Sequence, residues 1–145
     1  MAKRKTAGVV DDEAVVEKEI VTPFNAKELE HFRALIIAKR RTAQDDINRM
    51  RALLEDARED AQNDSAYSFH MADAGTDAME REKLYLMIAR QQKYVGYLNR
   101  AHDRIDSGVY GVCKVTGDPI SKARLEAVPH TEISIKAKRL QSRKA

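Results

Sequence analysis

The stretch NAKELEHFRALIIAKRRTAQDDINRMRALLEDA (residues 25–57) carries an apolar pattern with a seven-residue step. The two rows of this pattern are Leu29, Ile36, Ala43, Met50 and Ala57, and, interleaved with them, Phe32, Ile47 and Leu54. Arg40 interrupts the second row. Such a repeat is typical of a coiled-coil seam. It predicts one long α-helix whose apolar stripe must be covered by another helix.

The start of this helix is encoded locally. Asn25 is a good N-cap residue, and Glu28, three residues later, completes a capping box. Phe24 and Leu29 are placed for a hydrophobic staple. The predicted helix therefore begins just after Asn25.

A second seven-residue pattern follows further along the chain. Its members are Leu84, Gln91, Leu98 and Ile105, beside Met87, Ile88, Tyr94, Val95 and Ala101. Thr76 or Asp77 is expected to cap this helix, with Glu80 three residues after Asp77, and Gly108 is expected to end it in a left-handed conformation. Gln91 is a polar residue in the seam, which favours one register at some cost in stability.

The two patterns together predict a fold of the mainly α class. Each helix of roughly 30 residues is about 45 Å long and lacks the apolar surface to be stable alone. We therefore expect a long antiparallel coiled-coil hairpin over 23–107, with its tip at about 60–76. Residues 1–22, with a basic patch before an acidic run, are expected to form a flexible N-terminal arm. Residues 108–145 are expected to form a small zinc-ribbon-like globule with a basic C-terminal helix.

The composition limits the classes of function. Charged residues make up 34% of the 145 residues and aromatic residues 6%, a balance that suits long solvated helices better than a large core. The net charge of +3 is too small to imply nucleic-acid binding by itself. The single cysteine excludes an intramolecular disulfide and fits a reducing compartment. No apolar run of membrane-spanning length or signal-peptide type is present, so a cytoplasmic protein is expected.

The connector between the helices, within REDAQNDSAYSFHMADAGTDAMEREK (58–83), is longer than the two to eight residues that a simple reversal needs. It places the carboxylates of Asp64, Asp73 and Asp77 near small residues. Small side chains let a partner approach the backbone closely, and a carboxylate can contact a metal, an arginine or an amide. We assign Asp77 to helix capping and Asp73 to function.

The C-terminal segment GVYGVCKVTGDPIS (108–121) predicts two short extended pieces around a turn at 116–119. The stretch ARLEAVP (123–129) follows it, and Thr131 is expected to cap a terminal helix. No acidic residue follows Glu132, so the end of the chain is basic.

The succession of long helix, acidic tip, long helix and this segment resembles the DksA/TraR family of bacterial transcription regulators. The resemblance covers roughly residues 25–138. Its most specific part is the pattern Tyr110-Gly111-x-Cys113-x-x-x-Gly117-x-x-Ile120-x-x-x-Arg124-Leu125-Glu126-Ala127-x-Pro129.

The resemblance implies a structural zinc that this chain lacks the ligands to bind. Members of the family usually hold zinc with four cysteines, which correspond here to Cys113, Thr116, Ser134 and Ala137. One cysteine, even with His102 and His130, gives an irregular set instead of the four thiolate or imidazole ligands of a closed site. We therefore expect no metal, with Cys113 as a small buried hydrophobe. The expected replacement is an apolar core packed on the base of the hairpin, made of Val112, Val115, Ile120, Leu125, Val128, Ile133 and Ile135.

The resemblance also implies a mechanism. Proteins of this kind insert the hairpin into the secondary channel of RNA polymerase, place its tip near the active centre and bind no specific DNA sequence. The family's tip pattern, Asp-x-x-Asp-x-Ala, corresponds here to 70–75, with His70 in place of the first carboxylate and Gly75 in place of the alanine. Asp73 is the expected main contact, flanked by His70, Ala74 and Gly75.

The same family often acts together with guanosine tetraphosphate. Of three basic positions that hold its phosphates, Lys138 fits one, whereas Tyr97 and Val128 occupy the others. Because each charge-assisted contact contributes about 1.5–3 kcal/mol, a weak or absent response is expected.

Other classes of function remain open on the residues alone. A nucleic-acid-binding module would use the basic C-terminal residues Lys136, Lys138, Arg139, Arg143 and Lys144. A transcript-cleavage factor would bind Mg²⁺ through Asp73 and Asp77. A coiled coil that only spaces or dimerises other parts explains the heptads equally well. No catalytic triad or phosphate-binding glycine loop is present, and we expect no enzymatic activity.

Overall fold

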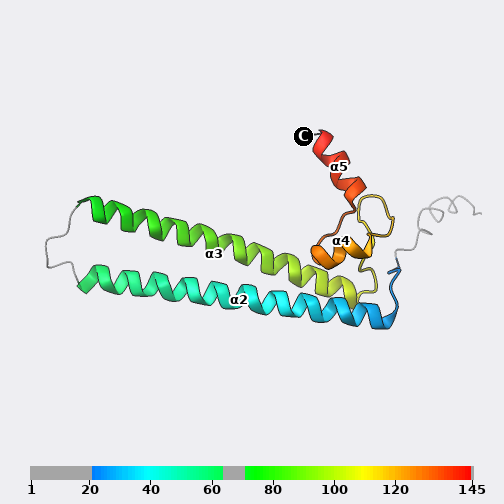
Figure 1. Ribbon diagram of the computed structural model, residues 1–145, viewed down its shortest axis with the longest axis horizontal. Helices are drawn as coiled ribbons and strands as arrows, with labels where there is room; N and C mark the ends of the chain where they lie inside the picture. The colour runs from blue at the N-terminus through cyan, green and yellow to red at the C-terminus, as the bar shows by residue number, and fades with distance from the viewer. Residues whose placement is uncertain (1–20, 64–70, 145) are drawn as a thin grey trace, which may run out of the picture. The chain divides into compact units, whose positions relative to one another are not determined.

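The computed structural model describes residues 21–63 and 71–144, with the side chains of 21–60 and 76–143. Its elements are α2 (Ala26–Asn63), α3 (Met71–Asp106), α4 (Lys122–Ala127) and α5 (Ile135–Lys144) (Figure 1). Across the described ranges, β pairing is limited to one isolated bridge between Val112 and Pro119. The mainly α class is therefore confirmed. The expected flexible arm falls, for residues 1–20, outside the described residues.

The start of α2 has the predicted capping box. The Asn25 side-chain oxygen Oδ1 accepts a hydrogen bond from the Glu28 amide at 2.8 Å, and Glu28 Oε1 accepts one from the Asn25 amide at 3.0 Å. Two amides that the helix leaves without partners are thereby satisfied.

Among the described residues, no helix is both long enough and apolar enough to cross a membrane.

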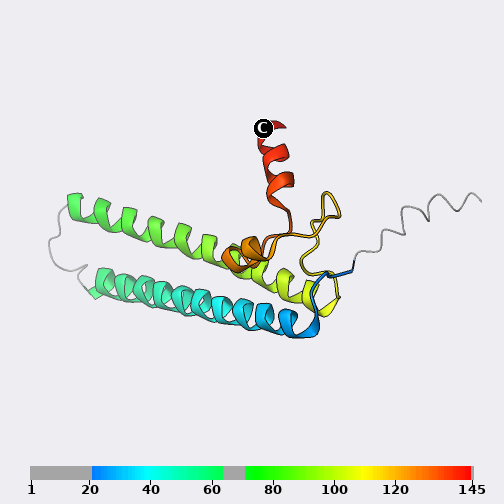
Figure 2. The same cartoon turned by 45° about the vertical axis from the view of Figure 1, so that its right-hand side comes forward.

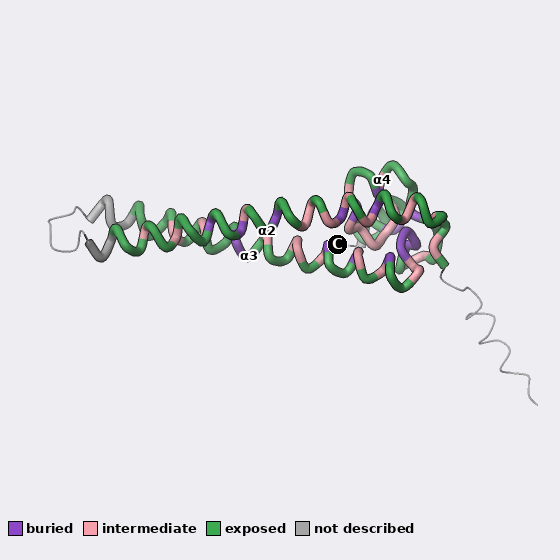
Figure 3. The backbone as a smooth tube through the Cα atoms, turned by 90° about the horizontal axis from the view of Figure 1, so that it is seen from below, coloured by how far each residue is buried: buried purple, intermediate pink, exposed green. Residues whose placement is uncertain are grey.

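Helices α2 and α3 lie side by side and antiparallel along residues 34–100 (Figures 1 and 2). The buried residues follow the predicted rows, and Figure 3 shows them alternating with exposed positions along both helices. They are Ile36, Ala43, Ile47, Met50, Ile88 and Leu98. Arg40, which interrupts the row on α2, donates a hydrogen bond to Asn99 Oδ1 of α3 at 2.9 Å. The arginine that interrupts the apolar row is thus accommodated by a hydrogen bond between the two helices.

Both helices run into the predicted tip. Helix α2 continues to Asn63 and α3 already begins at Met71, so Thr76 and Asp77 are interior residues of α3. The prediction that one of them caps the second helix is wrong. Alanine and methionine are frequent in 71–79 and have a high helix propensity, which outweighs the local preference of Thr76 and Asp77 for a cap.

Residues 21–33 and 101–144 form one compact unit, and residues 34–100 form another. In the first unit the rings of Phe24, Phe32 and Tyr110 meet, with centroids 5.3 Å apart for Phe24–Phe32 and 5.4 Å for Phe32–Tyr110. Tyr110 is buried and donates a hydrogen bond from its hydroxyl to the Pro129 carbonyl at 2.8 Å. The expected packing of the C-terminal segment against the base of the hairpin is therefore confirmed.

The expected apolar core of this unit is only partly correct. Val112, Ile120 and Leu125 are buried, but the side chains of Val115 and Ile135 are 51% and 41% exposed. Val115 lies in the turn that precedes Gly117, and Ile135 is the first residue of α5, so neither faces the interior.

Two boundaries in this segment were not predicted. Helix α4 is capped by Ser121, whose side chain accepts a hydrogen bond from the Arg124 amide at 3.2 Å. At α5 the capping side chain is that of Ser134, which accepts from the Ala137 amide at 3.1 Å. The prediction that Thr131 caps the terminal helix is wrong, because the Thr131 hydroxyl instead bonds to Arg124 and Ile133. Gly108, with φ of 77°, has the predicted left-handed conformation after α3.

Candidate functional site

The predicted tip residues lie at the beginning of α3. Asp73, Ala74 and Gly75 belong to the helix, although their side chains are not described, and His70 lies outside the described residues. Asp73 is in the first turn of α3, where the helix dipole favours a negative charge. The first neighbours with described side chains, Thr76 and Asp77, are exposed.

The four positions that correspond to the zinc ligands lie together in the C-terminal unit. The Cys113 sulfur accepts hydrogen bonds from the Ser134 amide at 3.3 Å and from the Thr116 amide at 3.5 Å. The Ser134 hydroxyl in turn accepts from the amide of Ala137. Cys113 and Ala137 are both fully buried. The arrangement of a ligand cluster therefore persists, with main-chain amides directed at a single sulfur.

The Cys113 sulfur is more polar than the expected small hydrophobe. Burial raises the pKa of the thiol, but the hydrogen bonds from Thr116 and Ser134 outweigh burial and hold that pKa at about 6. The prediction that Cys113 is a small buried residue is confirmed, and the structure adds that its sulfur accepts two main-chain hydrogen bonds.

Zinc does not fit these residues. A hydroxyl stands at the second and third ligand positions and a methyl group at the fourth, whereas a closed site needs four thiolate or imidazole ligands. Over the part of the chain that is described, the only three metal-ligating residues close enough to share an ion are His102, Asp103 and Asp106.

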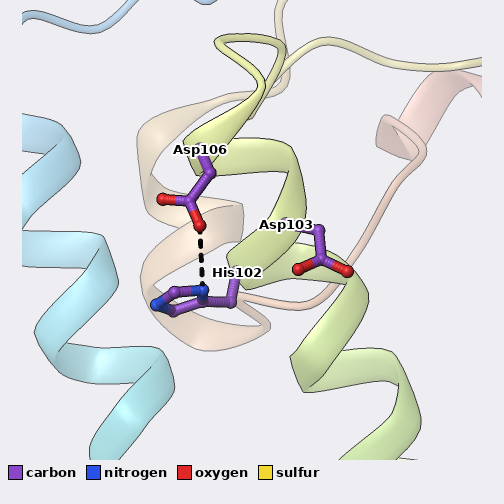
Figure 4. Close-up of side chains that lie close together, drawn as sticks. All are labelled: His102, Asp103 and Asp106. Atoms are coloured by element: carbon purple, nitrogen blue, oxygen red, sulfur yellow. Dashed lines mark ion pairs between the residues drawn. The ribbon is translucent and has the colours of Figure 1, made fainter.

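Figure 4 shows the side chains of that cluster. The positively charged guanidinium of Arg33 already pairs with Asp106 there. Arg33 donates one hydrogen bond to Asp106 Oδ1 at 2.7 Å and one to His102 Nε2 at 3.2 Å. His102 Nδ1 lies 3.5 Å from Asp106 Oδ2. The hydrogen bond from Arg33 holds the pKa of the Asp106 carboxyl below its ordinary value. The cluster is therefore best explained as an ion pair that joins the first turns of α2 to the end of α3.

Helix α5 presents the basic surface that the sequence predicts. Lys136, Lys138, Arg139 and Arg143 are exposed, and three of them, with Ile135 and Ser142, line an open groove. Lys144 is the last residue of α5, and its side chain is not described. This helix could contact an anionic partner, but its geometry indicates no particular one.

The chain is similar to known proteins both in its C-terminal segment and along almost its whole length. The family model described as prokaryotic dksA/traR C4-type zinc finger matches residues 108–142. The RNA polymerase-binding transcription factor DksA of Caulobacter vibrioides (strain NA1000 / CB15N) is 26% identical over 141 residues, which cover 97% of this chain and 94% of that protein. The structure of transcription factor DksA2 from Pseudomonas aeruginosa matches with a TM-score of 0.71 and 25% identity, covering 83% of this chain and 87% of that one. Residues 108–142 thus belong to the DksA/TraR zinc-finger family, and the chain as a whole is similar to DksA proteins.

A third relative matches a shorter part of the chain. General stress protein 16O of Bacillus subtilis (strain 168) is 37% identical over 68 residues, which cover 47% of this chain and 42% of that protein. The family's description as a C4-type zinc finger contrasts with the single cysteine here. In this DksA/TraR zinc-finger segment the fold is thus present without the four cysteine ligands.

The sequence did not indicate which residues fasten α4 to the base of the hairpin. Lys122 pairs with Glu28 at 2.8 Å, and Glu126 pairs with His31 at 2.7 Å. The hydrogen bond from Lys122, then that from Asn25, lowers the pKa of Glu28. These pairs join residues more than 90 positions apart, so no local pattern in the sequence could have revealed them.

Proposed function

We propose that this protein is a transcription regulator that binds bacterial RNA polymerase. The observation that carries the proposal is the similarity over nearly the full length of the chain, both long helices included, to a protein named as an RNA polymerase-binding transcription factor. The similarity in fold to a second transcription factor of the same family supports it. This role places the protein in the cytoplasm, where the polymerase is.

The proposed binding mode is insertion of the hairpin into the secondary channel of the polymerase. Helix α3 has 36 residues and is therefore about 54 Å long at 1.5 Å per residue. A pair of helices of this length has a small cross-section and can carry a few residues deep into a channel. The buried seam between the helices is mostly apolar, and their exposed faces carry many charged residues, with exposed apolar side chains such as Tyr85 and Leu86 among them on α3.

At the tip we propose Asp73 as the main contact with the active centre. Its place in the first turn of α3 gives it a rigid support, and Ala74 and Gly75 beside it leave room for close approach. The carboxylate would act by electrostatics and hydrogen bonding, without a bond being made or broken. His70 is proposed as a weaker, neighbouring contact.

A transcript-cleavage factor is the second candidate, and one observation favours it. Asp77 is not a cap, so Asp73 and Asp77 are four residues apart on one helix, and the Asp77 side chain is exposed. Carboxylates with this spacing lie on the same helical face and could share a Mg²⁺ ion. RNA cleavage in stalled complexes, abolished by Asp73→Ala, would support this candidate over the first.

For guanosine tetraphosphate we propose a weak or absent response. Lys138 is exposed and available, but Tyr97 and Val128 stand where two further cations would be needed. One lysine neutralises little of a highly charged nucleotide. Sequence-specific DNA binding is likewise not part of the proposed function.

The proposal is tested by titrating labelled protein with purified core RNA polymerase and, separately, with duplex DNA. We expect saturable binding to the polymerase, which persists in the variant Lys138→Ala/Arg139→Ala, and no comparable binding to DNA. If the polymerase is not bound, and DNA is bound with an affinity that falls steeply with salt and with the loss of those two cations, the basic helix α5 is a nucleic-acid module and the proposal is wrong.

A further inference from the structure

The residues at the lost zinc-ligand positions connect two distant parts of the chain through hydrogen bonds. The Cys113 sulfur lies at the start of the turn 113–118, and the Ser134 amide that donates to it lies 21 residues away, at the start of α5. The Thr116 amide donates to the same sulfur from within the turn. A structural zinc fastens such a knuckle to the following segment through four metal bonds. Here the same two pieces are joined through one acceptor atom.

Other contacts of the C-terminal unit reinforce this link. Arg104 donates to the carbonyl of Val112, directly before Cys113, at 2.7 Å, and Arg124 donates to the carbonyl of Ile133, directly before Ser134, at 3.0 Å. The Lys114 amide donates to the Glu132 carbonyl at 2.9 Å. The segment around Cys113 and the segment around Ser134 are therefore each fixed by hydrogen bonds of neighbouring residues, either between main-chain groups or from a guanidinium group. These bonds position the two amides toward the sulfur without any metal.

The residue at the fourth ligand position, Ala137, is part of the packed interior of this segment. Ala137 is fully buried, and its amide is bonded to the Ser134 hydroxyl, so its methyl group fills space within the unit instead of presenting a ligand. Tyr110, Ile120 and Leu125, all buried, supply the apolar burial that a zinc-dependent finger of this size lacks.

We propose that residues 108–144 fold without zinc, and that the hydrogen bonds from the Thr116 and Ser134 amides to the Cys113 sulfur take the place of metal ligation. The inference concerns the fold of this unit and does not depend on the proposed polymerase binding.

The first test measures zinc and thermal stability on one preparation of the full-length protein. We expect far less than one zinc per chain and the same melting temperature with and without EDTA. One zinc per chain, together with a melting temperature that falls on addition of EDTA, would overturn the inference. A matched control is the variant Thr116→Cys/Ser134→Cys/Ala137→Cys, which restores four thiols. We expect it to bind one zinc and to become sensitive to EDTA, and its failure to bind zinc would contradict the placement of the four positions around one point.

The second test asks whether the sulfur is an acceptor or only fills space. Cys113→Ala leaves two amides without a partner, whereas Cys113→Ser keeps an acceptor atom at the same position. We expect the alanine variant to melt about 5 °C below the wild type or lower, and the serine variant to recover part of that loss. Equal melting temperatures for the wild type and Cys113→Ala would show that the hydrogen bonds to sulfur do not hold the unit. If Cys113→Ala does not fold at all, the zinc and EDTA measurements on the wild type still decide the question of metal.

Discussion

The substitution Gly111→Ala is expected to destabilise the unit formed by 21–33 and 101–144 by about 3 kcal/mol. Gly111 has φ of 87°, a conformation that a residue with a Cβ adopts at a cost of about 1–2 kcal/mol. A Cβ there would also overlap the Phe24 ring, touching Cε2 and lying 2.9 Å from Cδ2. The ring packs against Phe32 and Tyr110, so it cannot move aside without disturbing the aromatic core.

Substitutions at two other glycines separate the cost of the left-handed backbone from the cost of the steric overlap with Phe24. Gly108 has φ of 77° but nothing within 4 Å of an added Cβ, so Gly108→Ala should cost only the conformational part, about 1 kcal/mol. Gly96 lies inside α3 with open space around it, so Gly96→Ala should stabilise the hairpin by up to about 1 kcal/mol. Urea denaturation followed by circular dichroism measures all three. If Gly111→Ala costs no more than Gly108→Ala, the close approach between Gly111 and Phe24 is not a feature of the protein in solution.

The substitution Asp73→Asn is expected to abolish most of the effect of the protein on transcription while leaving its affinity for RNA polymerase unchanged. The change removes a charge and keeps the size of the side chain. Since a charge-assisted hydrogen bond contributes about 1.5–3 kcal/mol, the change in the lifetime of promoter complexes should shrink by about tenfold or more. The measurement is the decay of competitor-resistant promoter complexes at saturating protein.

The matched control for this experiment is Asp77→Asn. Asp77 stands four residues further along α3 and is exposed, so its neutralisation changes the net charge of the tip by the same amount. We expect the control to keep nearly the full effect. If both variants lose the effect equally, the tip acts through its overall charge and the assignment to Asp73 is wrong. If Asp73→Asn loses affinity instead, the residue contributes to binding and not to the regulatory step.

The hairpin could be predicted because its determinants are local or periodic. The rows that contain Ile36, Ile47 and Leu98 repeat every seven residues, and such a repeat specifies which face of a helix is buried before any partner is known. The capping box of Asn25 and Glu28 spans three residues and has the expected hydrogen bonds. The left-handed Gly108 is likewise a local signal.

The C-terminal unit was less predictable because long-range contacts determine it. Helix α4 has six residues, too few to show a period, and its Lys122 and Glu126 pair with residues at the start of α2. The polar role of Cys113 depends on the Ser134 amide, which only the folded chain brings to the sulfur. A cysteine without partner cysteines predicts only a small buried hydrophobe, and nothing in the sequence indicates the hydrogen bonds to its sulfur.

The central claim is that the tip of the hairpin reaches the active centre of RNA polymerase through the secondary channel. It is tested most directly by placing a photo-crosslinking amino acid at Ala74, next to Asp73, and mapping the products on the polymerase. A second variant, with the crosslinker at the exposed Gln92 of α3, serves as the matched probe on the shaft of the hairpin. The account predicts crosslinks from position 74 to segments around the catalytic centre, and from position 92 to the walls or entrance of the channel. Crosslinks from position 74 only to the outer surface of the polymerase, or only to DNA, would contradict it.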